Sequence, residues 1–193
     1  TALFDGALKS LGQALTIRPG DEVALVLRAD TNMNIALFRV GDSKAMAPPL
    51  AAAIADYGAA LGRNPSRDDA WYGRGYCSSL LSTVCREQDR DSFWREALDD
   101  FEKAIKLNPN SAQAHRYRGY AYSEHDKHRE ALADFEKAIV LDSTLKNVLD
   151  AEIELRRLVR NLGVLAEVDL PVFAHRDVLG QRPAQEPERS IRP

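Results

Sequence analysis

Apolar and small residues recur at helical spacing along most of the first 162 residues, and this pattern predicts helices rather than strands. Within it, residues 97–105 return as residues 131–139, with alanine, phenylalanine, alanine and isoleucine at the same places. The two copies are 34 residues apart. A fixed period of this length is typical of stacked helical hairpins, so the pattern predicts an all-α solenoid.

The clearest unit of the repeat lies at residues 111–143, which divide into a helix, a short turn and a second helix. Gly119 and Ala131 are small enough to let two antiparallel helices approach closely, and Phe135 can fill the space beside them. Pro109 ends the preceding helix, because proline lacks the amide hydrogen that a continuing helix needs. The unit therefore predicts one closely packed helical hairpin.

This unit resembles the tetratricopeptide repeat (TPR), whose motif places glycine, tyrosine, alanine, an aromatic residue and alanine at set positions within 34 residues. Those positions hold Gly119, Tyr122, Ala131, Phe135 and Ala138. The unit departs from the motif where tryptophan, leucine and proline are more usual, at His115, Arg118 and Ser143. The resemblance implies a right-handed α-α superhelix of stacked helix pairs.

Residues 1–163 are expected to form one helical domain, and alignment with this unit divides that domain into repeats. The expected parts are a half repeat at 1–19, repeats at about 21–65, 67–109 and 111–143, and a capping helix at 144–162. The first two full repeats carry twelve and ten extra residues, which either lengthen the helices or loop out between them. We favour lengthened first helices, with turns at Gly41–Ser43 and Gln88–Asp91.

The two ends of the array differ in kind. Residues 145–162 carry an apolar stripe with no partner helix after it, which is the form of a capping helix. The charged residues expected to face away from the stripe are Glu152, Arg156, Arg157 and Arg160. Residues 164–193 contain four prolines and predict an extended tail. A tail in the groove of its own array would be autoinhibitory, but packing elsewhere is favoured. The apolar first helix lacks a covering helix, so either residues precede Thr1 or another chain packs there.

Composition and charge limit the classes of partner and the compartments expected for the protein. The chain has 26 basic and 29 acidic residues and a net charge of −3, which gives no reason to expect nucleic acid as a partner. No apolar run approaches the ~20 residues that span a bilayer. Cys77 and Cys85 would lie about 12 Å apart on one helix, too far for a disulfide. A soluble, cytoplasmic protein is favoured over a periplasmic or secreted one.

A search for chemistry finds no catalytic constellation. The histidines at 125 and 128 are the only local cluster of metal-ligand side chains, and they fall where a polar turn is expected, with no third ligand nearby. Neither cysteine has a neighbouring histidine, and the chain has no glycine-rich phosphate loop. The sequence therefore predicts no catalytic residue, no metal site, no cofactor and no enzyme activity.

In TPR proteins the first helix of each repeat lines the concave side, and the resemblance implies a peptide-binding face there. Seven residues are predicted to bind the peptide: Tyr72, Tyr76, Gln113, Arg116, Tyr117, Tyr120 and Glu124. Tyrosine offers a large contact area with a polar tip, although each tyrosine could equally be half-buried core. Some TPR domains grip a chaperone's C-terminal carboxylate with lysine and asparagine. Here the corresponding positions hold Val26, Asp30, Gly73, Gln113 and Tyr117.

The sequence thus predicts a non-catalytic protein–protein interaction module that binds a peptide or an extended protein segment in its concave groove. One alternative is an assembly subunit that self-associates or docks through its N-terminal helix. Another is the regulatory fragment of a larger enzyme.

Overall fold

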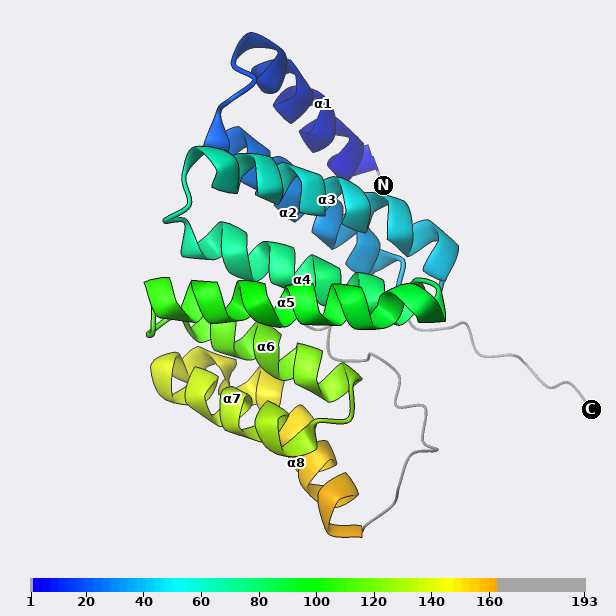
Figure 1. Cartoon of the computed structure of the whole chain (residues 1–193), viewed down its shortest axis with the longest axis vertical. Helices are drawn as coiled ribbons and strands as arrows, with labels where there is room; N and C mark the ends of the chain where they lie inside the picture. The colour runs from blue at the N-terminus through cyan, green and yellow to red at the C-terminus, as the bar shows by residue number, and fades with distance from the viewer. Residues whose placement is uncertain (1, 163–193) are drawn as a thin grey trace, which may run out of the picture.

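The computed structural model describes residues 2–162, and over this range the chain forms eight α-helices and one short 3-10 helix, η1 (Figure 1). The elements are α1 (Ala2–Ile17), α2 (Glu22–Phe38), α3 (Ser43–Arg63), α4 (Asp68–Val84), α5 (Glu87–Leu107), α6 (Ala112–Glu124), α7 (His128–Leu141), η1 (Ser143–Leu145) and α8 (Lys146–Leu162). The predicted tail at 164–193 lies outside the described residues.

The helices pack in consecutive pairs, α2 with α3, α4 with α5 and α6 with α7. Neighbouring pairs join because α3 contacts α4 and α4 contacts α6, while α1 packs on α2 and α8 packs on α7. Figure 1 shows the pairs stacked in chain order, from α1 at the top of the view to α8 at the bottom. The predicted all-α solenoid of stacked helix pairs is confirmed.

Polar caps determine where several helices begin. The carboxylates of Asp21 and Asp42 accept hydrogen bonds from the amides three residues later, at 3.1 and 3.0 Å, and start α2 and α3. Ser111 does the same for α6 through its hydroxyl oxygen, at 3.3 Å. Each cap satisfies an amide that the first helical turn leaves without a partner.

The extra residues of the second full repeat are helical, and the predicted turn at Gln88–Asp91 is wrong. The turn is formed by Cys85 and Arg86, and α5 begins at Glu87. Glu87 and Asp89 lie in the first turn of α5, where negative charge is favourable beside the helix N-terminus. Compared with the last repeat, the first helix grows from 13 to 17 residues and the second from 14 to 21.

One aromatic ring fills the interior of each helix pair. Tyr57, Phe101 and Phe135 are each 0% exposed and occupy equivalent places on α3, α5 and α7. The helices approach so closely that a Cβ atom added to Gly119 would lie 2.6 Å from Cε1 of Phe135. Contacts this short do not occur between packed carbon atoms, so glycine is required where α6 crosses the ring.

A second repeated feature is an arginine–aspartate pair within each helix pair. The side chains of Arg28, Arg74 and Arg118 each reach across to the second helix of their own pair and donate two hydrogen bonds, of 2.6–2.8 Å, to one carboxylate. The partners are Asp56, Asp100 and Asp134, which are all buried. Bidentate geometry of this kind fixes both helices in register. It explains why arginine stands at 118 in place of leucine.

Candidate functional site

Tyrosines from α4 and α6 form one continuous cluster, made of Tyr72, Tyr76, Tyr117 and Tyr120 and here called the tyrosine cluster. The rings of Tyr76 and Tyr117 are stacked with centroids 4.3 Å apart, and Tyr72 lies 5.6 Å from Tyr117. Tyr120 lies 6.5 Å from Tyr76. The helical spacing i, i+3 and i+4 places these side chains on the adjoining faces of two neighbouring helices, as the sequence analysis expects.

Burial divides the seven predicted peptide-binding residues into two groups. Tyr76, Tyr120 and Arg116 are only 1%, 5% and 7% exposed, whereas Tyr72, Gln113, Tyr117 and Glu124 are partly exposed. Four of the seven therefore present side-chain area at the surface, and three lie almost wholly inside. Burial raises the pKa of Tyr72 and of Tyr120 well above the usual range, so both hydroxyls keep their protons at neutral pH. A role for all seven in peptide binding stays a prediction.

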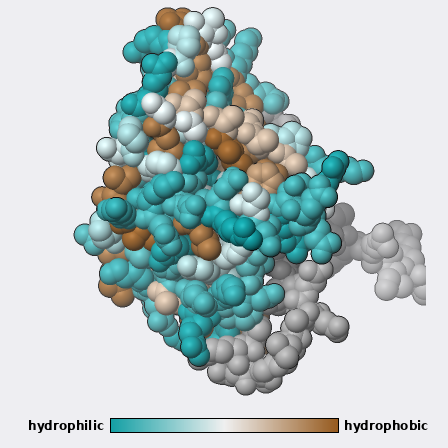
Figure 2. All heavy atoms as spheres, in the orientation of Figure 1, coloured by the Kyte–Doolittle hydropathy of each residue, from teal (hydrophilic) through white to brown (hydrophobic). Residues whose placement is uncertain are grey.

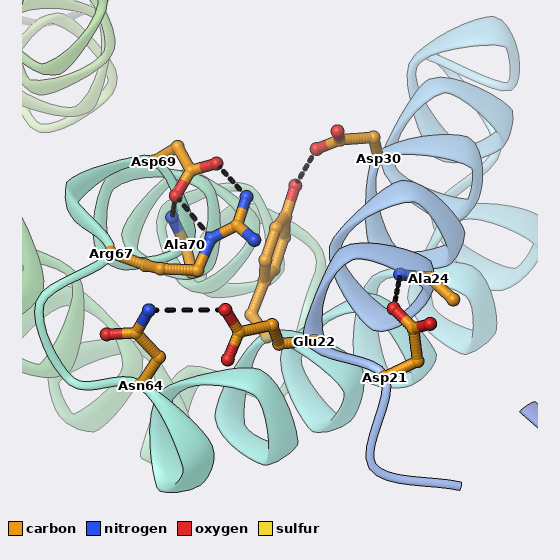
Figure 3. Close-up of polar contacts among 9 residues, drawn as sticks. Asp21, Glu22, Ala24, Asp30, Asn64, Arg67, Asp69 and Ala70 are labelled. Atoms are coloured by element: carbon orange, nitrogen blue, oxygen red, sulfur yellow. Dashed lines mark hydrogen bonds and ion pairs between the residues drawn. The ribbon is translucent and has the colours of Figure 1, made fainter. Parts of the chain in front are cut away.

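Asp30 and Asp69 lie near Tyr72, since both carboxylates raise its pKa. Figure 3 shows the polar contacts of these two aspartates. Asp30 accepts a hydrogen bond from the hydroxyl of Tyr57, and burial of its carboxylate raises the Asp30 pKa. Arg67 donates two hydrogen bonds to Asp69, at 3.0 and 2.6 Å, and a nearby bond of 3.2 Å joins the Asn64 amide to Glu22. Arg67 is thus paired with Asp69, and Asp30 is bonded to the hydroxyl of Tyr57.

At the other end of α6, a charged cluster links Glu124 to α8. The Nε atom of Arg156 donates to Ser123 Oγ, and an Nη atom lies 3.3 Å from Glu152. The prediction that Glu152 and Arg156 face away from the array is wrong, because Arg156 is only 7% exposed and bonds to α6. The helix turns these two residues inward because α8 packs over the end of α6 as well as on α7. Sequence reasoning missed them as neighbours of the site.

Glu124 gives this end of the site an unusual titration. Its pKa rises to about 7, chiefly because burial disfavours the charged form and secondarily because Glu152 and Asp126 repel it, while Arg156 partly opposes the shift. Between pH 4.5 and about 7 the folded protein holds a proton that the unfolded chain has lost. The free energy of unfolding therefore falls as pH rises through this window.

We expect Glu124→Gln to remove this pH dependence. The neutral amide carries no charge to bury, so at pH above about 8 the variant should be more stable than the parent by up to roughly 3 kcal/mol. Below about pH 4.5 the two should differ little, because the parent carboxyl is then protonated in both states. Urea unfolding across pH measures the difference. Glu130→Gln, at an exposed position of α7, is the matched control and should leave the pH profile unchanged.

The histidines of the predicted polar turn are packed rather than solvated. The ring of His125 stacks on Trp94 with centroids 4.1 Å apart, and its Nε2 lies 3.1 Å from Ser82 Oγ. Burial is the main cause that lowers the pKa of both His125 and His128. Over residues 2–162, no group of three or more His, Cys, Asp or Glu side chains is arranged to hold a metal ion. Within the same range, no helix is long and apolar enough to cross a membrane.

Comparisons with known proteins agree on the architecture. Residues 50–78 match a family model described as tetratricopeptide repeat, and residues 94–126 match one described as TPR repeat. The crystal structure of a thermophilic TPR protein in Thermus thermophilus superposes with a TM-score of 0.65 and 21% identity. That likeness covers 83% of this chain and 75% of the other.

A weaker likeness is to the TPR2B domain of yeast Sti1 in a complex with pHsp70, with a TM-score of 0.47 and 18% identity over 72% of this chain and 99% of that domain. A comparison with curated proteins finds no significant match. At 21% identity, the likeness to the Thermus thermophilus protein bears on the fold of this chain and not on its function.

Proposed function

Since the chain belongs to the tetratricopeptide repeat family, we propose that it acts by binding an extended segment of a partner protein across α4 and α6, at the tyrosine cluster. The observation that carries the proposal is the continuous contact of four tyrosines from two helices, with Tyr72 and Tyr117 partly exposed. Protein binding in general fits a TPR chain; the site and the extended form of the ligand are the proposed parts.

The cluster has the physical properties of a recognition surface. Tyrosine rings bury large areas at a small cost in conformational entropy, and the hydroxyls remain donors because their pKa values are raised. Stacking of Tyr76 on Tyr117 restrains both rings, and side chains that are already restrained lose little freedom on binding. Such a surface would accept apolar side chains and backbone carbonyls of an extended segment.

The test is a selection of peptides from a random library of about 12 residues displayed on phage, followed by affinity measurements with the synthetic peptides. Truncating either exposed ring, in Tyr72→Ala or Tyr117→Ala, should weaken binding by about 5- to 30-fold, the usual effect of losing an aromatic anchor. Val140→Ala changes a 78% exposed residue of α7 and should bind as the parent does. Equal affinity in all three variants would place the binding site elsewhere.

A second candidate function is assembly through the N-terminal end of the solenoid. Three large apolar side chains of α2 are unusually exposed there, Val23 at 53%, Leu27 at 49% and Phe38 at 57%. Phe38 contacts Phe4 of α1 with ring centroids 6.5 Å apart, so this exposed ring adjoins the first helix. Figure 2 shows hydrophobic residues reaching the surface at this end of the molecule. Exposed large apolar side chains favour contact with another protein surface.

A further inference from the structure

We propose that Arg116 binds an aspartate or glutamate side chain of the partner segment. The inference rests on the proposed function and adds the chemistry of one ligand group. It arises from the state of the guanidinium group, which differs from that of Arg156, the other buried arginine of the described residues.

Arg116 is buried, and no carboxylate of the described residues forms an ion pair with it. It is 7% exposed, and within residues 2–162 no side chain or backbone group forms a hydrogen bond or ion pair with it. Its Nε atom is fully buried without an acceptor, and the guanidinium lies over the Tyr117 ring at 4.7 Å. By contrast, the buried carboxylates of the array are already paired, for example Asp100 with Arg74 and Asp134 with Arg118.

An unpaired buried guanidinium is costly, because it loses hydration without gaining an acceptor. The side chain nevertheless packs against the tyrosine cluster, where a bound segment would pass. Arg116 lowers the pKa of Asp142, but this carboxylate is partly exposed and bonded to Thr144, and the two residues form no ion pair. A carboxylate supplied by the ligand would remove this cost and form a bidentate pair.

The guanidinium of Arg116 lies next to a residue that reaches the surface. Its Nε atom is buried without an acceptor, and the group packs over the ring of Tyr117, which is partly exposed. One helical turn earlier, the Oε1 atom of Gln113 is also buried without a partner. Gln113 and Arg116 stand at i and i+3 and so share one side of α6. Together they offer an acceptor for a backbone N–H and donors for a carboxylate.

We expect the carboxylate that pairs with Arg116 to belong to a residue inside the bound segment and not to its C-terminal end. The tyrosine cluster extends from Arg116 toward Tyr72 and Asp30, and α6 continues the other way to Glu124. A segment lying on this surface would pass Arg116 in both directions. Glu124 at the far end of α6 and Glu152 of α8 would repel a doubly charged phosphate more than a single carboxylate. Asp or Glu therefore fits the charges best.

The experiment uses the full chain and the peptides selected above on the parent protein. We expect these peptides to share an Asp or Glu at one position. One such peptide, acetylated and amidated to remove both end charges, is then compared with its Asn or Gln counterpart on the parent and on Arg116→Gln. On the parent, losing the carboxylate should weaken binding about tenfold or more, and on Arg116→Gln it should have little effect.

Two further measurements make the result decisive. Arg116→Lys keeps the charge but lacks the planar fork, so it should recover only part of the affinity. Arg116→Gln should unfold at a temperature no lower than that of the parent, because it removes an unpaired buried charge, and this shows that lost binding is not lost folding.

The outcomes separate this inference from the proposed function. One outcome would overturn the role of Arg116 but leave the proposed site intact. In it, peptide binding depends on Tyr72 and Tyr117, but replacing the acidic residue of the peptide weakens binding equally on the parent and on Arg116→Gln. Binding that requires a free C-terminal carboxylate or a phosphate would also overturn it. Selected peptides that ignore Tyr72 and Tyr117 would overturn the proposed site, and the inference with it.

Discussion

Replacing Phe135 by alanine is expected to lower the free energy of unfolding by about 3–5 kcal/mol. The ring is 0% exposed, meets Tyr120 edge-on with centroids 5.1 Å apart, and fills the space that Gly119 leaves between α6 and α7. Its removal forfeits the transfer free energy of a whole aromatic side chain and leaves a cavity. Contacts of α6 with α4 and of α7 with α8 restrain collapse of the two helices into that cavity. Urea unfolding followed by circular dichroism measures the loss.

The control for this prediction lies on the same helix. Val140→Ala removes an apolar side chain that is 78% exposed and should change the free energy of unfolding by about 0.5 kcal/mol or less. A comparable loss in both variants would show that burial in the pair interior is not the cause.

A double-mutant cycle tests the close approach itself. Gly119→Ala alone should cost roughly 1–3 kcal/mol, because its Cβ atom would lie 2.6 Å from the Phe135 ring. In the Phe135→Ala background the ring is absent and the added methyl group should cost little. Additive losses in the double variant would contradict direct contact between these residues.

Much of the fold could be predicted because the similar segments at 97–105 and 131–139 show how the repeats align with one another. Gly119 and Phe135 meet in the structure for the reason that their residue types suggest, namely close helix contact around one ring. The turn at Gln88–Asp91 was mispredicted because a run of polar residues resembles a turn locally. In the structure that run begins the exposed side of a long helix, and the turn lies before it, next to the end of α4.

The candidate site was predicted less well, because exposure depends on residues distant in sequence. Helical spacing alone places Tyr76 and Tyr117 on neighbouring faces, but it does not show that Tyr76 is almost fully buried. Likewise, Arg156 reaches Ser123 only because α8 packs over the end of α6. A hydrophobic stripe indicates which side of a helix is buried, but not which charged residues at its edge are buried too.

The arginine–aspartate pairs did leave a signal in the sequence. Successive arginines are separated by 46 and 44 residues, which are the lengths of the two enlarged repeats, and successive aspartates by 44 and 34. Each aspartate directly precedes the aromatic residue of its second helix. Charged residues that recur with the repeat at core positions indicate ion pairs inside each unit.

Replacing Asp134 by alanine should therefore destabilise the protein strongly, by about 3–5 kcal/mol. Its buried carboxylate accepts two hydrogen bonds from Arg118, of 2.7 and 2.8 Å, and lies 2.9 Å from His115 Nδ1. Truncation leaves the guanidinium and the imidazole next to each other with no acceptor between them. Most of the loss is the cost of these stranded groups and not the net worth of the pair. Asp99→Ala, at an exposed position of α5, should have little effect.

The interpretation can be tested by removing both charges together. Arg118→Leu combined with Asp134→Leu restores the residue type more usual in the TPR motif at position 118 and leaves no stranded charge. The double variant should therefore recover a large part of the stability that Asp134→Ala loses, because apolar replacement of a buried ion pair is often neutral or stabilising. His115 keeps one unpaired nitrogen in this variant, so recovery should be incomplete. If the double variant were less stable than Asp134→Ala, the pair would contribute net stability beyond what apolar packing supplies, and the bidentate geometry would itself hold α6 against α7.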